Sequence, residues 1–157
     1  MRVIEKTIYT FDELDDSAKN RAREWYRRGL DYPWFGEAMD SLRAFCDEFG
    51  VEILDYSLGD YRGFVKTNAQ NANFRGLKLS QFDREAMPTG VCFDCSLRYT
   101  FADEFKKHGS ALDAFKSALN AFTIDIERDV VFYFSDDSID EQIEANEHEF
   151  DEFGGIA

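Results

Sequence analysis

Two cysteines, Cys92 and Cys95, form a C-x-x-C motif, a spacing that can hold zinc or close a redox-active disulfide. The surrounding residues alternate, with apolar side chains at every second position from Val91 to Phe101. This pattern predicts a strand over residues 91–101, on which positions three apart point to opposite faces. We therefore expect neither zinc nor a disulfide at this motif, and the sequence predicts no metal site and no cofactor.

The strongest chemical pattern is a run of carboxylates between residues 135 and 153, and no Lys or Arg follows Arg128. Ser135 is a suitable cap for a short final helix, whose first turn would favour acidic residues. Ile139, Ile143 and Phe150 would then cluster on one side of the helix. The predicted partner-binding residues lie on the adjacent arc: Asp136, Asp137, Asp140, Glu141, Glu144 and Glu147.

This arc places like charges three and four residues apart, and each such pair costs a few tenths of a kcal/mol. At a rise of about 1.5 Å per residue the arc carries one charge per roughly 3 Å, close to the ~3.4 Å of one DNA strand. We therefore expect a basic partner to recognise it, although the alternative of a merely solvated face stays open. Neutralising Asp140, Glu141 and Glu144 is expected to relieve repulsion and leave folding intact.

The overall charge limits the classes of partner. The chain has 157 residues, 32 Asp and Glu against 18 Lys and Arg, and a net charge of −14. Such a charge disfavours direct binding to nucleic acid or to anionic membranes, and it attracts basic protein surfaces. No apolar run is long enough for a membrane span or a signal peptide, so a cytoplasmic protein is expected. The oligomeric state is not predicted.

The fold class follows from the periodicity of the apolar residues. We expect one α+β domain over residues 1–157, with an antiparallel sheet packed against about four helices. Thr10 and Asp15 or Asp16 can cap the first helix, which Gly29 ends; Asp31 and Pro33 would open the second, which ends at Gly50. The predicted strands are 3–9, 51–58, 61–67 and 91–101, with a turn at Gly59-Asp60, and a long helix is predicted over 110–134.

Residues 68–90 are polar and interrupted by Gly and Pro, so they predict a long loop or one irregular strand. Basic residues in or near this region offer a second candidate surface: Arg62, Lys66, Arg75, Lys78 and Arg84. No nucleophile, base and orienting group can be assigned there or elsewhere, and we do not expect an enzyme.

Two segments, YTFDELDDSAKNRAREWYRRG (9–29) and DDSIDEQIEANEHEFDEFG (136–154), resemble the two ends of a family of small phage and prophage proteins. Members often carry the label "antitoxin of toxin-antitoxin stability system". The resemblance implies a phage or mobile-element origin, and hence action inside an infected bacterial cell. With the acidic arc, it suggests an anti-CRISPR or anti-restriction inhibitor that blocks the DNA- or RNA-binding surface of a host defence complex. The alternative is an antitoxin that neutralises a basic toxin.

Overall fold

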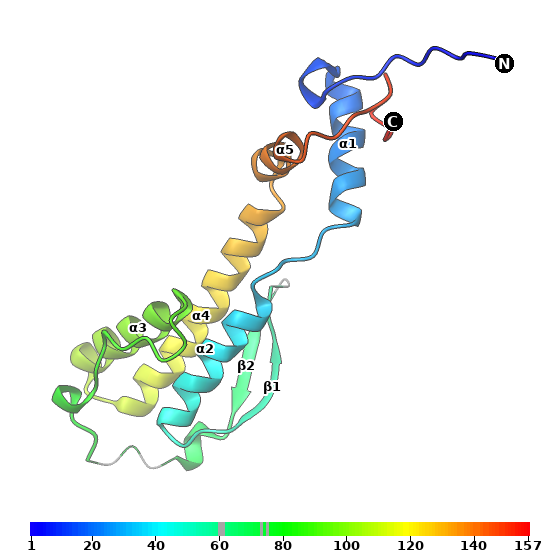
Figure 1. Cartoon of the computed structure of the whole chain (residues 1–157). Helices are drawn as coiled ribbons and strands as arrows, with labels where there is room; N and C mark the ends of the chain where they lie inside the picture. Colours follow the sequence, from blue (N-terminus) through cyan, green and yellow to red (C-terminus); the bar gives the residue numbers. More distant parts are fainter. Residues whose placement is uncertain (60–61, 73, 75) are drawn as a thin grey trace. The chain divides into compact units, whose positions relative to one another are not determined.

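The computed structural model describes residues 1–59, 62–72, 74 and 76–157 (Figure 1). Within these ranges it contains five α-helices, three short 3-10 helices and one two-stranded antiparallel sheet, which confirms the α+β class. The chain divides into two compact units: unit 1 contains residues 1–32 and 131–157, and unit 2 contains residues 33–130. No helix in the described ranges is long and apolar enough to cross a membrane.

Unit 1 begins with the predicted caps. The backbone N–H of Thr10 donates to Glu13 Oε2 at 2.8 Å, across the short 3-10 helix η1 (Phe11–Glu13). The side chain of Asp15 then caps helix α1 (Asp16–Arg28) by accepting from the N–H of Ala18 at 2.8 Å. Gly29 follows α1, as predicted.

The core of unit 1 joins the two ends of the chain. Helix α5 (Asp136–Ala145) begins after the predicted cap Ser135 and buries Ile139 and Ile143 completely. Phe150 is also fully buried. The rest of this core comes from the N-terminal segment: Phe11, Leu14, Ala18 and Ala22. The apolar side of the final helix is therefore confirmed as a packed surface.

The strand predicted over residues 3–9 is wrong. Residues 1–8 are exposed and form neither helix nor strand. Tyr9 alone forms an isolated antiparallel bridge with Phe150, through two backbone hydrogen bonds of 2.8 Å. The β-branched residues of this segment favour a strand, but a strand needs a neighbouring backbone to pair with. Among the described residues, this segment pairs with another backbone only at Tyr9.

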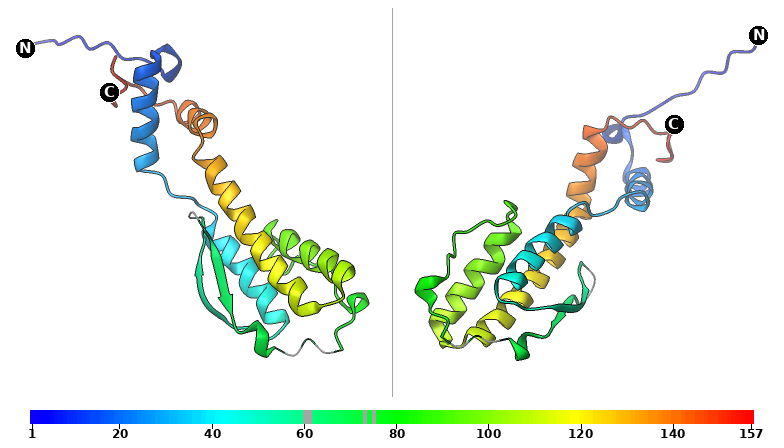
Figure 2. Two further views of the ribbon diagram at one scale, coloured as in Figure 1. Left: turned by 180° about the vertical axis from the view of Figure 1, so that it is seen from behind. Right: turned by 60° about the horizontal axis from the view of Figure 1, so that its bottom comes forward.

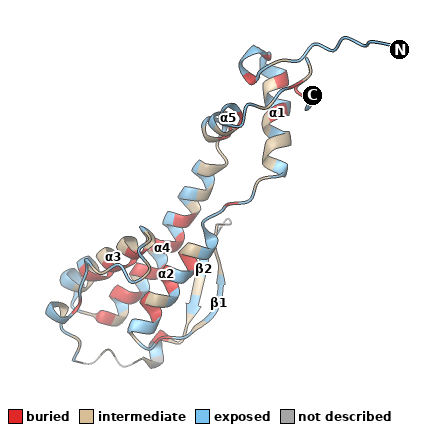
Figure 3. Cartoon of the chain, in the orientation of Figure 1, coloured by how far each residue is buried: buried red, intermediate tan, exposed pale blue. Residues whose placement is uncertain are grey.

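Unit 2 is built around phenylalanines from three helices, α2 (Phe35–Glu48), α3 (Phe93–His108) and α4 (Ala111–Tyr133). The rings of Phe45 and Phe115 stack at 5.3 Å, and Phe45 meets Phe101 edge-on at 6.0 Å. In Figure 3 the buried residues of these helices lie mainly on the sides that face one another. The predicted helix over 110–134 is confirmed. Helix α2 begins later than predicted, at Phe35, so Asp31 and Pro33 precede it.

The strand predicted over residues 91–101 is also wrong, because this segment belongs to α3. Leu97 and Phe101 fit an alternating strand, but they are also four residues apart and share one helix face. That face continues beyond the alternation, with Arg98 and Ala102 buried beside them. Basic residues occupy the last turn of the helix, and Gly109 then takes a left-handed conformation, which is a common helix ending.

A hairpin of β1 (Ile53–Ser57) and β2 (Phe64–Thr67) confirms the two predicted strands of this region, and they pair antiparallel. The views in Figure 2 show the hairpin beside α2 and α4. The turn predicted at Gly59-Asp60 reaches Asp60, which lies outside the described residues. The described part of residues 68–90 forms a loop with two short 3-10 helices, η2 (Ala69–Asn71) and η3 (Leu79–Gln81).

The loop before α3 is held by Asp94, a buried residue in the first turn of that helix. Asp94 Oδ2 accepts from the N–H of Thr89 at 3.0 Å, from its hydroxyl at 2.8 Å and from the N–H of Gly90 at 3.1 Å. A carboxylate near a helix N-terminus is favoured by the helix dipole. Asp94 thus ends the irregular segment and starts α3.

A stability prediction follows from the close approach of Gly154 to α1. Gly154 has φ +82°, and a Cβ there would lie 2.0 Å from the carbonyl oxygen of Ala18. Gly154→Ala should lower the free energy of unfolding of unit 1 by about 2–4 kcal/mol, through overpacking and backbone strain. Urea unfolding followed by Trp25 fluorescence, in a Trp34→Phe background, measures it.

Gly36→Ala is the matched control. Gly36 lies in the first turn of α2, and a Cβ there would meet no atom within 4 Å. This substitution should be neutral or stabilising by up to about 1 kcal/mol. Equal stability of the two alanine variants would show that Gly154 does not dock against α1 as described.

Candidate partner-binding surface

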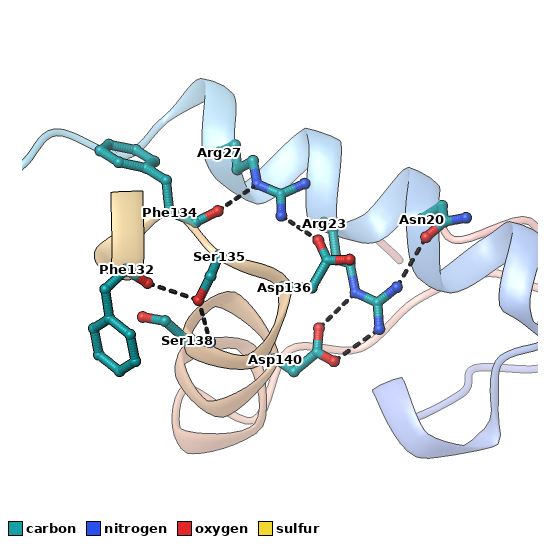
Figure 4. A network of polar contacts seen from close by, with 9 residues as sticks. All are labelled: Asn20, Arg23, Arg27, Phe132, Phe134, Ser135, Asp136, Ser138 and Asp140. Carbon is teal, nitrogen blue, oxygen red and sulfur yellow. Dashed lines mark hydrogen bonds and ion pairs between the residues drawn. The ribbon is translucent and has the colours of Figure 1, made fainter. Parts of the chain in front are cut away.

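The position of α5 is set by ion pairs with α1 as well as by its apolar side. Arg23 binds Asp140 with two nitrogens of its guanidinium: Nε donates to Oδ1 at 2.6 Å and Nη2 donates to Oδ2 at 2.7 Å (Figure 4). The third nitrogen, Nη1, donates to Asn20 Oδ1 at 2.8 Å. The hydrogen bonds to Asp140 raise the pKa of Arg23. Two parallel bonds to one carboxylate fix orientation as well as distance.

Arg27, one turn further along α1, also binds the start of α5. Its Nη2 donates to Asp136, and its Nε donates to the backbone carbonyl of Phe134 at 3.0 Å. The pKa of Asp136 is lowered, chiefly by the hydrogen bond from Arg27. Residue 23 thus pairs with residue 140, and residue 27 pairs with residue 136. The basic end of α1 therefore faces the acidic start of α5.

The six predicted partner-binding residues consequently divide into two groups. Asp136 and Asp140 are bound to arginines of the same chain. Asp137, Glu141, Glu144 and Glu147 are exposed, and within the ranges that the structure describes none of them forms an ion pair. The structure thus brings all six onto one helix and its C-terminal end, and in the described residues only these four carry no ion pair to the chain.

Asp12 joins this surface, although the sequence did not predict it. An open groove of about 490 Å³ lies between η1 and the end of α5. Its acidic lining residues are Asp12, Glu144, Glu147 and Glu149. Repulsion from Asp12, and a hydrogen bond between the two carboxyl groups, raise the pKa of Glu144 above its ordinary value, and the opposing effect of Lys19 is smaller. We call Asp12, Asp137, Glu141, Glu144 and Glu147 the acidic rim.

The two units differ in net charge. Unit 1 has seven Lys and Arg against sixteen Asp and Glu, a net charge of −9. Unit 2 is larger but has eleven against sixteen, a net charge of −5. The excess of unit 1 comes entirely from residues 131–157, because the bases and acids of residues 1–32 balance at seven each.

The basic residues of the second candidate surface are dispersed. Arg84 contacts Asp103 at 3.5 Å and lies over the Tyr99 ring at 4.8 Å. Arg62 and Lys66 belong to the hairpin region, and Lys78 precedes η3. Arg75 lies outside the described residues. One of the four described bases is therefore already paired with an acid of the chain.

Cys92 and Cys95 do not lie on the strand that the sequence predicted. Because Cys92 and Cys95 lie at the start of a helix rather than on a strand, positions three apart share a face, and the opposite-face argument does not apply. Both thiols are free, and Cys92 is exposed. Burial raises the pKa of the third thiol, Cys46, to about 12. No group of three potential metal ligands occurs in the described part of the chain.

Comparison of the chain with protein-family models, with curated proteins and with solved structures found no match. The resemblance to small phage proteins therefore stays a prediction, and the surface must be interpreted from its own chemistry.

The ion pair between Arg23 and Asp140 changes what we expect of charge removal. The two side chains are only 18% and 25% exposed, so their bidentate bond is partly shielded from water. Asp140→Asn should lower the free energy of unfolding by about 1 kcal/mol. Glu141→Gln, which removes the adjacent unpaired charge, should change it by less than about 0.5 kcal/mol. Urea unfolding of both variants tests this, and equal stability would mean that the Asp140 pair contributes nothing.

A second prediction concerns the like-charge pair. Asp12→Asn should lower the pKa of Glu144 toward its ordinary value, as measured by NMR titration of the carboxyl carbons. Asp137→Asn should leave it unchanged, because Asp137 is not among the groups that perturb Glu144. Since the raised pKa belongs to the folded state, the contribution of Glu144 to stability is present at low pH and is lost as the pH rises through that pKa. An unaltered pKa in Asp12→Asn would disprove the pairing.

Proposed function

We propose that the protein is an inhibitor that binds a basic, nucleic-acid-binding surface of a host protein and occludes it. The acidic rim would take the place of phosphates, with its carboxylates accepting hydrogen bonds from Lys and Arg of the target. Such a protein would act inside an infected bacterial cell, against a CRISPR or restriction complex. This proposal rests on a protein interface and involves no catalysis.

The observation that carries the proposal is the open groove of about 490 Å³ that four carboxylates line, where Asp12 raises the pKa of Glu144. Like charges held together raise the free energy of the unbound protein, and a cationic side chain placed between them would relieve that cost. A surface that serves only solubility has no need for such a pair, because dispersed charges provide solubility without the repulsion. The proposal therefore predicts that a Lys or Arg of the partner enters this groove.

The division of carboxylates within α5 supports the same conclusion. Asp136 and Asp140 hold the helix against α1, and Ile139 and Ile143 hold it against the core. The remaining acids therefore stand on a helix whose position is fixed before any partner arrives. Preorganisation of this kind lowers the entropy cost of binding.

A neutralised variant tests the proposal. Asp137→Asn, Glu141→Gln, Glu144→Gln and Glu147→Gln together remove four charges and leave the ion pairs to α1 intact. Affinity for the host protein, identified by pull-down from host lysate with wild-type protein, should fall at least roughly tenfold, mainly through a slower association rate. Wild-type binding should weaken as salt is added.

The matched control removes four acids from unit 2 that have no side-chain partner among the described residues: Glu37→Gln, Asp47→Asn, Glu52→Gln and Glu127→Gln. Both variants have the same net charge, so a general charge effect would weaken both equally and would contradict a specific acidic rim. Plaque formation on an immune host should be restored by wild type and by the control, and not by the rim variant. Rescue of cells from a single toxin instead would favour the antitoxin alternative.

A further inference from the structure

Residues 3–8 have the composition of a strand but no sheet to join. Four of these six residues are β-branched: Val3, Ile4, Thr7 and Ile8. All six are exposed, with Val3 at 77% and Ile4 at 80%. β-branched residues favour an extended backbone, and burying exposed apolar side chains such as Val3 and Ile4 is favourable. The bridge between Tyr9 and Phe150 holds the end of this segment to unit 1.

Unit 2 contains the complementary feature, a strand with one unpaired edge. The sheet contains only β1 and β2 in the described ranges, so β2 pairs along one side. The N–H of Asn68 donates toward β1, to the carbonyl of Glu52 at 3.2 Å. Backbone groups of successive strand residues point alternately to the two edges, so those of Val65 and Thr67 point to the open side. No further backbone partner occurs there among the described residues.

A groove of about 290 Å³ accompanies this open edge, between β2 and α4. On the β2 side it is lined by Val65 and Thr67, and on the α4 side by Lys116, Leu119 and Asn120. Phe64, Ala69 and Gln70 also line it, so the groove combines apolar residues with polar ones. Gly63 lies at its end, where an added Cβ would come within 3.5 Å of Thr123. Unpaired edges of this kind accept an extended segment from another chain.

We propose that residues 3–8 of a second copy of this chain add to the open edge of β2, so that two copies exchange strands. Alternate residues of the donated strand match the two faces they would meet. Val3, Glu5 and Thr7 would face the groove, where Lys116 can pair with Glu5. Ile4, Lys6 and Ile8 would lie on the other face of the donated strand.

The charge of this segment is complementary to that of unit 2. Arg2 and Lys6 against Glu5 make residues 2–8 net positive, whereas unit 2 is net negative. Two whole copies nevertheless repel, because each carries −14. Added salt screens that repulsion and should strengthen the exchange. Binding of a basic partner to the acidic rim has the opposite salt dependence, so the two interactions are distinguishable.

Variants of the donor segment test the proposal without disturbing either folded unit. Sedimentation equilibrium of the full chain, from micromolar to millimolar concentration, should show wild type approaching twice the mass of one chain. Ile4→Pro removes an N–H and should weaken the dimer at least about tenfold, whereas Ile4→Val should retain it. A wild type that stays monomeric, or an Ile4→Pro protein that dimerises as wild type does, would overturn the proposal.

A charge swap identifies the groove itself. Glu5→Lys and Lys116→Glu should each weaken the dimer, and the two together should restore it. Hydrogen exchange should show protection of the Val65 and Thr67 amides in the dimer and loss of that protection in Ile4→Pro. Protection of these amides in a protein that remains monomeric would place the segment on its own chain, and failure of the double variant to recover would place the interface elsewhere. Either result would contradict strand exchange between copies.

Discussion

The pairing of the basic end of α1 with the acidic start of α5 determines the surface chemistry of unit 1. Without Arg23 and Arg27, Asp136 and Asp140 would be unpaired acids beside the others on α5. With them, these two carboxylates become part of the fold, and the unpaired Glu144 and Glu147 line the groove beside η1. The same helix therefore combines acids that hold it in place with acids that face solvent, and only the opposing arginines distinguish them.

Much of the fold could be predicted from local signals. The caps Asp15 and Ser135, the stripe of α4 and the β1–β2 pair each rest on residues close together in sequence. The errors come from segments whose structure depends on distant contacts. Residues 91–101 alternate as a strand would, yet Leu97 and Phe101 also fit a helix, and packing against Phe45 and Phe115 favours the helix. Residues 3–8 have strand propensity but no neighbouring backbone.

The candidate site was predictable in part for the same reason. The spacing of the carboxylates on α5 follows from one helix, so their arc could be read from the sequence. That Arg23 binds Asp140, 117 residues away, could not. Nor could the approach of Asp12 to Glu144, because it depends on how η1 folds back on α5. The sorting of acids to the start and bases to the end of α1 was the one available signal, and it was equally well explained by the helix dipole.

Unit 1 is assembled from the first and last parts of the chain, with all of unit 2 between them in the sequence. During synthesis, α1 therefore emerges early and exposes Phe11, Leu14 and Ala22 until α5 and Phe150 have been made. Unit 2 is complete before that point, and once folded it shortens the effective loop that must close. The order of translation thus imposes an order of folding. During this interval Arg23 and Arg27 have no carboxylate partners on α5. A chain stalled before residue 131 would have a first segment with equal numbers of acids and bases and with its apolar side exposed. Chaperones and proteases could then reach that side.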